Sequence, residues 1–332
     1  MWQNILGHEA QKQFLKNYLQ AAARPHALLF CGAAGLGKER LALEFSKSLL
    51  CLNGAEADAC ESCRLMNLED NSFAHPDFIH MGIEEGYKTI RIEQIKELIG
   101  QTAFAPMLSA SKVCLITDAD KMTEAAYNSL LKLLEEPPVG WVLLLIAERE
   151  ERLLPTILSR VVCLRFQPVA EALVMEALTK KQVPLEKARV LSRFSEGSIG
   201  TALQLWEQDA FAYREQAVAL LEALPLNTPF GYLAGRVWLE KYERQEAILF
   251  VKLLQLLVRD MLFLKLEAQV EIYNCDLQED LKNAADYWQL AGLQEALTAI
   301  NEAYGALVSN VGIKLTLEAM ALKINNAYKK KE

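Results

Sequence analysis

Residues 27–39 read Ala-Leu-Leu-Phe-Cys-Gly-Ala-Ala-Gly-Leu-Gly-Lys-Glu, a short apolar run followed by a glycine-rich loop. The apolar run at 27–31 predicts a buried strand, and residues 39–50 have the spacing of a helix with one apolar face. Strand, glycine-rich loop and helix are the context that a phosphate-binding loop requires, because glycines let backbone N–H groups approach phosphate and a helix N-terminus favours negative charge. The stretch therefore predicts an α/β domain built around a nucleotide-type P-loop.

The P-loop is complete except at its last position, where the pattern calls for Ser or Thr and this chain has Glu39. The missing hydroxyl would ligate the Mg²⁺ of a bound triphosphate, and the carboxylate in its place repels phosphate. Gly32, Gly35, Gly37 and Lys38 keep the backbone cradle. Two interpretations stay open, residual nucleotide binding or a loop kept only as a tight turn, and ATP binding is doubtful.

Strand and helix signals alternate through the first half of the chain, which predicts a parallel sheet covered on both faces. The expected strands after the P-loop are 113–116, 141–147 and 161–166, and the expected helices are 5–21, 90–102 and 124–136. We expect residues 51–77 to be irregular, since three cysteines, glycine, asparagine and aspartate interrupt any periodic pattern there.

After Pro168 the strand signals nearly vanish and helical spacing runs to the end of the chain. A short helical block covers about 170–207. A longer block follows from about 209, with strongly apolar helices expected near 213–224, 244–268, 286–306 and 312–328. We therefore expect three domains: an α/β domain at 1–166, a small helical domain at 167–208 and a helical domain at 209–332.

The composition fits a folded protein of the cytoplasm. The chain has 332 residues and a net charge of −8, so it is poorly suited to gripping the DNA backbone over a broad surface by itself. We expect neither a secretory signal nor a membrane span. Seven cysteines without a signal peptide favour a reducing compartment, so the predicted localisation is cytoplasmic.

Several separate stretches point to one family. They are the P-loop at 32–39, the cysteines from Cys51, His75-Pro76-Asp77, the run Asn-Ser-Leu-Leu-Lys-Leu-Leu-Glu-Glu-Pro-Pro at 128–138, Ser159-Arg160, and residues 310–320. Together they resemble the AAA+ clamp-loader subunits of bacterial DNA polymerase III. The run at 128–138 is far more specific to clamp loaders than a P-loop alone. The resemblance covers the whole length and is strongest over 24–166.

The resemblance implies a fold and a set of partners. The three expected domains would be an AAA+ P-loop domain, a helical lid and a helical collar. Members of the family form a complex that contains motor (gamma/tau) subunits, a delta subunit and a rigid subunit. The rigid subunit typically does not hydrolyse ATP. The assembly opens the ring-shaped sliding clamp and loads it on primed DNA. This chain is similar to the rigid member, and through that complex it would belong to the DNA polymerase III holoenzyme.

By this resemblance the chain's own ATP site has lost its catalytic parts. Hydrolysis needs a metal, a carboxylate that activates water, and cations that stabilise developing charge. Thr117 stands where the metal carboxylate is expected, and Asp118 occupies the water-activating position. The polar sensor position carries Glu148, and the lid arginine position carries Gly200. Together with the missing hydroxyl, these changes predict lost catalysis.

Ser159-Arg160 has a different expected role. In the family an arginine here reaches the ATP of the neighbouring subunit as a trans arginine finger, a task that suits guanidinium because it is always charged and bidentate towards phosphate. The alternative is a surface arginine in an ordinary salt bridge. The upstream motifs favour the finger.

Cys51, Cys60 and Cys63 have the spacing C-x₈-C-x₂-C. Family members often add a fourth cysteine three residues later and so bind zinc, but this chain has Met66 there, and a thioether is a poor zinc ligand. Glu61, Glu69, Asp70 and His75 are candidate substitutes that the sequence does not choose among. A zinc site and a decayed site with reduced thiols both stay open.

Three functions remain to be distinguished. The first is a non-hydrolysing clamp-loader stator that supplies Arg160 in trans. The second is an active AAA+ ATPase, a clamp-loader motor subunit or a related helicase loader. The third is a standalone nucleotide sensor. The replaced catalytic positions favour the first.

Overall fold

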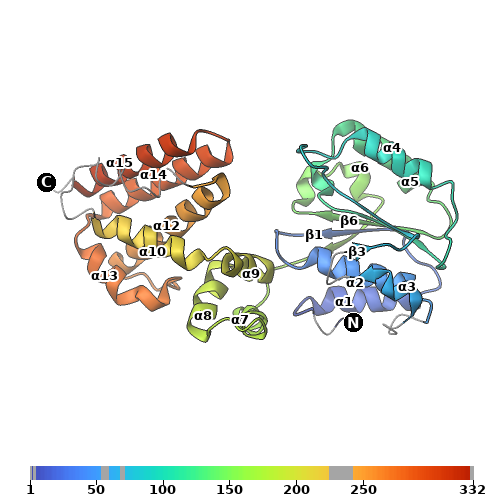
Figure 1. The fold of residues 1–332 in the computed structure, drawn as a ribbon, viewed down its shortest axis with the longest axis horizontal. Helices are drawn as coiled ribbons and strands as arrows, with labels where there is room; N and C mark the ends of the chain where they lie inside the picture. The colour runs from blue at the N-terminus through green and yellow to red at the C-terminus, as the bar shows by residue number, and fades with distance from the viewer. Residues whose placement is uncertain (1, 3–4, 54–59, 68–71, 224–241, 330–332) are drawn as a thin grey trace. The chain divides into compact units, whose positions relative to one another are not determined.

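The computed structural model describes residues 2, 5–53, 60–67, 72–223 and 242–329. The chain divides into two compact units (Figure 1). The first comprises 1–177 and 196–201, and the second comprises 178–195 and 202–332. Each unit has its own hydrophobic core.

The first unit contains a five-stranded sheet in which every pairing is parallel. Its strands, in spatial order, are β4 (Phe78–Met81), β5 (Lys112–Ile116), β6 (Trp141–Ala147), β1 (Ala27–Cys31) and β7 (Val162–Arg165). Because the strands are parallel, their carboxyl ends all lie at one edge of the sheet, where ligands of such folds bind. The P-loop follows β1 at that edge.

Helices cover both faces of the sheet (Figure 1). One face packs against α1 (Glu9–Gln20) and α2 (Lys38–Leu50), and the other packs against α4 (Ile92–Gln101), α5 (Glu124–Glu135) and α6 (Pro155–Leu158). Every residue of β1, β5 and β6 is buried, which explains why these strands appear in the sequence as apolar runs, preceded in β5 by Lys112. The predicted α/β class and parallel sheet are confirmed.

The expectation of irregular structure around 51–77 was wrong in part. The short helix α3 (Glu61–Arg64) lies there, with a small antiparallel pair, β2 (Met66–Asn67) and β3 (Ser72–Phe73). Edge strand β4 was missed altogether. It has four residues and only partial burial, so it lacks the apolar run that identified the other strands.

The second unit is helical. Helices α7 (Glu171–Lys180) and α9 (Ile199–Glu207) each have residues in both units. The other helices among the described residues of this unit are α8 (Leu185–Phe194), α10 (Ala210–Ala223), α12 (Arg244–Lys265), α13 (Gln278–Asp286), α14 (Leu290–Val308) and α15 (Ile313–Lys329), with a 3₁₀ turn, η5 (Cys275–Leu277). The helix expected at 286–306 is α14, which begins only at Leu290 because the chain turns at 287–289, and α13 before that turn was not expected.

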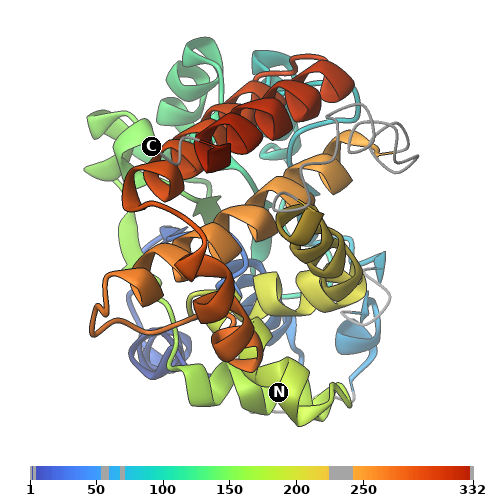
Figure 2. The ribbon, with the colours of Figure 1, turned by 90° about the vertical axis from the view of Figure 1, so that its left-hand side faces the viewer.

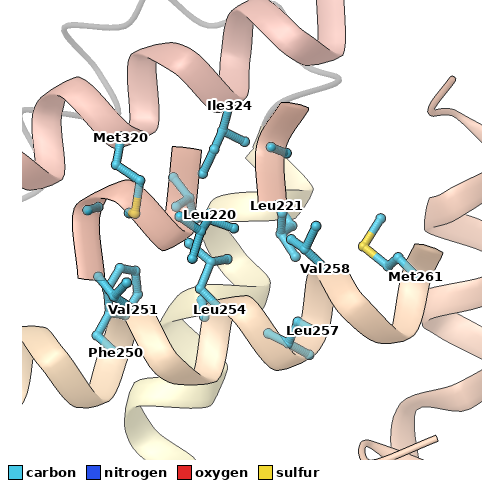
Figure 3. Packing of buried hydrophobic residues seen from close by; sticks show 14 of the residues in the cluster. Leu220, Leu221, Phe250, Val251, Leu254, Leu257, Val258, Met261, Met320 and Ile324 are labelled. Atoms are coloured by element: carbon cyan, nitrogen blue, oxygen red, sulfur yellow. The ribbon is translucent and has the colours of Figure 1, made fainter. Parts of the chain in front are cut away.

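Helix α12 is the centre of this unit. It packs against α10, α13 and α14. Helix α14 in turn packs against α15, and Figure 2 shows these two helices side by side. Ten of its residues are buried, and Figure 3 shows its apolar side chains meeting those of α10 and α15. Because α12 is buried over so much of its surface, its sequence is apolar over most of its length. Among the described residues, no helix is apolar over enough of its length to cross a membrane.

Candidate functional site

The P-loop keeps the backbone shape that its glycines predict. Gly32, Gly35 and Gly37 have φ values of 148°, 72° and 83°, which L side chains rarely adopt. A Cβ on Gly32 would lie 2.5 Å from the carbonyl oxygen of Phe166. The loop is therefore held close to the chain that follows β7, and glycine is needed there for space as well as for φ.

The ammonium group of Lys38 is turned back onto this loop. Its Nζ donates to the carbonyl oxygens of Gly32 at 2.5 Å and Ala33 at 2.6 Å, and the residue is only 6% exposed. Burial lowers the pKa of Lys38, although nearby carboxylates, Glu148 foremost, oppose that shift. The cation that would meet a phosphate is thus satisfied by the loop itself.

Residues 196–201 lie directly against the same loop. The N–H of Gly200 donates to the carbonyl oxygen of Gly35 at 2.9 Å, and the hydroxyl of Ser198 donates to that of Ala34 at 3.2 Å. A Cβ on Gly200 would lie 2.8 Å from the Cα and the oxygen of Gly35. The position expected to carry a lid arginine is therefore a backbone contact with no space for a side chain.

The other expected catalytic positions take part in local contacts. The Glu39 carboxylate lies 3.7 Å from Nε2 of His80, at the end of β4. The hydroxyl of Thr117 donates to the carbonyl oxygen of Met81 at 3.3 Å, and Asp118 accepts from Lys121 at 2.7 Å. None of these contacts forms the hydroxyl and carboxylate pair that holds Mg²⁺ on a triphosphate.

Asp120 is a carboxylate that the sequence interpretation missed. Its side chain is fully buried, and Oδ1 accepts from the N–H of Glu148 at 3.3 Å. Within the described part of the chain, Oδ2 has no hydrogen-bond partner, and Arg152 lies 3.9 Å from it. The sequence signal that could have identified Asp120 is its position two residues after Asp118, just beyond the strand β5. Asp120 links the end of β5 to the end of β6.

Arg160 follows α6 and lies beside the end of α5. Its Nη2 donates to Glu135 at 2.8 Å, and its Nη1 donates to the carbonyl oxygen of Thr156 at 2.9 Å and the hydroxyl of Ser159 at 3.0 Å. The side chain is 35% exposed. The residue therefore makes the ordinary salt bridge that was one alternative, and it also remains accessible to solvent.

The three cysteines predicted as metal ligands come together. Cys51 ends α2, Cys60 caps the N-terminus of α3, and Cys63 lies within α3; all three sulfurs are within 4.8 Å of one another. The Cys51–Cys60 and Cys60–Cys63 Sγ separations are 3.8 Å and 3.3 Å. Tetrahedral Zn–S bonds of about 2.3 Å place sulfurs about 3.8 Å apart, so the cluster fits a metal ion.

The thiols of Cys60 and Cys63 differ in pKa. Burial alone would raise the pKa of Cys60, but the N–H of Cys63 and the neighbouring thiols lower it to about 7. Burial and the neighbouring thiols of Cys60 and Cys51 raise the pKa of Cys63 to about 12. One member of the cluster thus loses its proton near neutral pH, as a metal ligand must.

Met66 does not complete the cluster, because it is fully buried in the apolar core on the α2 face of the sheet. Among the proposed substitutes, His75 has both ring nitrogens hydrogen-bonded within the chain and Glu61 is exposed. Glu69 and Asp70 lie outside the described residues. Within those residues the metal-binding group contains the three cysteines alone.

His75 has a structural role. Its Nδ1 accepts the N–H of Asp77 at 3.0 Å, so in the neutral ring Nε2 carries the proton. Nε2 lies 2.8 Å from the hydroxyl of Ser62 and 3.3 Å from that of Ser109, and both hydroxyls donate to the carbonyl oxygen of Leu50. Burial lowers the pKa of His75, which keeps this tautomer neutral. The network joins the end of α2 to the cysteine segment.

Asp77 organises the neighbouring loop. Its fully buried carboxylate accepts the N–H groups of Met107 at 2.6 Å and of Leu108 and Ser109 at 2.8 Å each. Burial alone would raise the pKa of Asp77, but these three donors hold it below the ordinary 3.8. His75-Pro76-Asp77 is therefore a support for two loops and not a catalytic group.

The sheet order, the P-loop after β1 and the altered site define a P-loop protein of the AAA+ type that lacks the usual metal ligands. Residues 7–170 match the family model described as DNA polymerase III, delta subunit. The DNA polymerase III subunit delta′ of Bacillus subtilis is 31% identical over 94% of each chain. The chain belongs to this delta′ family of DNA polymerase III subunits.

Two further DNA polymerase III subunits match this chain over part of its length. The delta′ subunit of Pseudomonas aeruginosa is 38% identical over 59% of this chain and 60% of its own length. The tau/gamma subunit of Haemophilus influenzae is 30% identical over 62% of this chain and 30% of its own. A gamma subunit-related protein from Thermotoga maritima covers 97% of this chain and 99% of its own, with 19% identity and a TM-score of 0.48.

We expect Asp77→Asn to reduce the free energy of unfolding by about 3 kcal/mol at pH 7, because three N–H donors lose a buried anion. The lowered pKa means that this contribution is present above pH 3.8 and is lost as pH falls through the folded-state pKa. Urea unfolding at pH 7 and pH 3 measures both effects.

The exposed Asp286→Asn is the matched control and should change little. If the difference between the Asp77 variant and the native protein is the same at both pH values, the assigned role of the carboxylate is wrong.

Proposed function

We propose that this protein is a non-hydrolysing stator of the DNA polymerase III clamp loader, assembling with motor (gamma/tau) and delta subunits. The sliding clamp and primed DNA are its partners through that assembly, since a net charge of −8 does not suit a broad DNA contact of its own. The domains at 1–166, 167–208 and 209–332 would act as AAA+ domain, lid and collar. The protein would work in the cytoplasm.

One observation is the main support for a subunit that does not hydrolyse ATP: the Lys38 ammonium is hydrogen-bonded to its own loop. A triphosphate would have to displace that contact without the help of Mg²⁺, since Glu39 replaces the metal-binding hydroxyl and adds repulsion. The contact of Gly200 with Gly35 leaves no place for a lid arginine. These features together favour a subunit that does not use ATP at its own site.

An active motor subunit is the second candidate, and the similarity to the tau/gamma subunit favours it. That similarity covers 62% of this chain and 30% of the tau/gamma subunit. The positions that separate them are the catalytic ones, and Glu39, Thr117, Glu148 and Gly200 all oppose catalysis. The non-hydrolysing function therefore remains the better account.

We assign Arg160 and Ser159 to catalysis at the neighbouring subunit's ATP. A trans finger must be charged and reachable, and Arg160 is a partly exposed guanidinium on a short helix end. Ser159 contributes by accepting one of its N–H groups. Arginine fingers of this kind increase rates by ~10³–10⁵.

The cysteine cluster would hold zinc with Cys51, Cys60 and Cys63 as thiolate ligands. Zinc there would be structural, tying the end of α2 to α3, both of which also join the His75 network. A three-thiolate set leaves the fourth position to a ligand outside the cluster.

The isolated protein should show no Mg²⁺-dependent ATP turnover above that of its Lys38→Ala variant, because the metal ligands are missing. A coupled phosphate-release assay with both proteins measures this. Turnover by the native protein that Lys38→Ala abolishes would establish the motor function instead.

Arg160→Ala should lower ATP turnover by about 10³-fold at the neighbouring site while the subunit still folds and assembles. The measurement is single-turnover hydrolysis in a reconstituted loader whose only competent ATP site adjoins this subunit. Arg165→Ala is the matched control, since both Nε and Nη2 of Arg165 are bound to Glu150. Equal rates for the Arg160 variant and the native protein would remove the finger assignment.

Purified protein should contain about one zinc per chain, and Cys60→Ser should weaken zinc binding at least about tenfold and lower the melting temperature. Elemental analysis and thermal unfolding with and without a chelator measure these effects. Cys275→Ser, in the second unit, is the control and should leave both unchanged. Metal-free native protein that melts identically with chelator would show a decayed site.

A further inference from the structure

Among the described residues, Glu135 is the one acidic side chain that contacts the Arg160 guanidinium. The ion pair joins the last residue of α5 to the residue after Ser159, 25 positions later, at 2.8 Å. The other two contacts, with Thr156 and Ser159, come from the short segment that carries Arg160 itself. Glu135 is thus the contact that fixes the guanidinium relative to the rest of the domain.

The geometry leaves Arg160 able to bind a further anion. Its three contacts take at most three of the five guanidinium N–H donors, and within the described residues Nε has no hydrogen-bond partner. Arg165 provides a contrast, because its Nε and Nη2 both bind the same Glu150 carboxylate. Arg165 is a closed ion pair, whereas Arg160 is held with a face still available for two hydrogen bonds to phosphate oxygen.

Local helix electrostatics do not explain a carboxylate at residue 135. The C-terminus of a helix carries partial negative charge, so an acidic side chain there is unfavourable. Glu135 is half exposed, and exposed ion pairs contribute little to stability. Glu136 lies next to it at the same helix end without contacting Arg160. Of the two glutamates at this helix end, Glu135 is hydrogen-bonded to the guanidinium, whereas Glu136, the C-cap, has no bond to it within the described residues.

We propose that Glu135 is a positioning residue that holds Arg160 in the orientation in which it meets the neighbouring subunit's triphosphate. This rests on the proposed finger role of Arg160. A pre-oriented guanidinium loses less conformational freedom when it binds the transition state, and misplacement by about 1 Å can cost 10²-fold in rate. The carboxylate acts through Arg160 and does not touch the nucleotide.

The test uses the reconstituted loader whose only competent site adjoins this subunit, and compares Glu135→Ala, Glu135→Asp, Glu135→Gln and Glu136→Ala. Alanine removes the acceptor and aspartate shortens it by one methylene, so both should lower kcat about tenfold with KM for ATP unchanged. Glutamine keeps the length and an oxygen acceptor, so it should retain at least about a third of the native rate. Glu136→Ala makes the same charge change without touching Arg160 and should have the native rate.

The Arg160→Ala loader distinguishes the two levels of the proposal. If Arg160→Ala leaves the rate unchanged, the proposed finger fails. If Arg160→Ala abolishes turnover and Glu135→Ala does not lower it, the finger stands and the positioning role is overturned. The double variant should be no slower than Arg160→Ala alone, because Glu135 acts through the arginine. A faster Glu135→Ala loader, or equal losses in the Glu135 and Glu136 alanine variants, also overturns the positioning role.

Discussion

The contact between the Lys38 ammonium and the carbonyl oxygens of its own loop is the feature on which the functional interpretation depends. A P-loop lysine is useful to catalysis when it is offered to phosphate, and here the loop already satisfies it. The contact of Gly200 with Gly35 closes the same loop from a segment far along the chain. On the proposed function, the P-loop fold is a structural framework whose loop is packed against the chain's own groups.

Polar groups outside the pocket give this framework its second set of constraints. Asp77 and His75 together bind two loops and the end of α2, and each is buried with its hydrogen bonds satisfied. Buried polar groups of this kind fix one arrangement because a different packing of the loops would leave buried donors unpaired. A rigid α/β domain is what a stator requires, and it would present Arg160 to a neighbour from a fixed base.

Arg160 and Arg165 show how two arginines of the same domain can differ in the number of donors they keep free. Arg165 is bound by both oxygens of the Glu150 carboxylate. Arg160 shares a single carboxylate oxygen and two neutral acceptors. The Glu150 carboxylate accepts from two nitrogens of Arg165, whereas the Glu135 carboxylate accepts from one nitrogen of Arg160. Each arginine is paired with one carboxylate, so the difference comes from geometry and not from the number of charges.

The sequence alone determined the strand, loop and helix around the P-loop, the parallel sheet and the helical second half, because apolar periodicity reports local burial directly. It also identified the substitutions at Glu39 and Met66, since these follow from motif spacing. Only the tertiary structure decided that Gly200 reaches Gly35, that Asp120 is buried and that Glu135 meets Arg160. These features depend on how segments that are distant along the chain pack together, and apolar periodicity does not encode that packing.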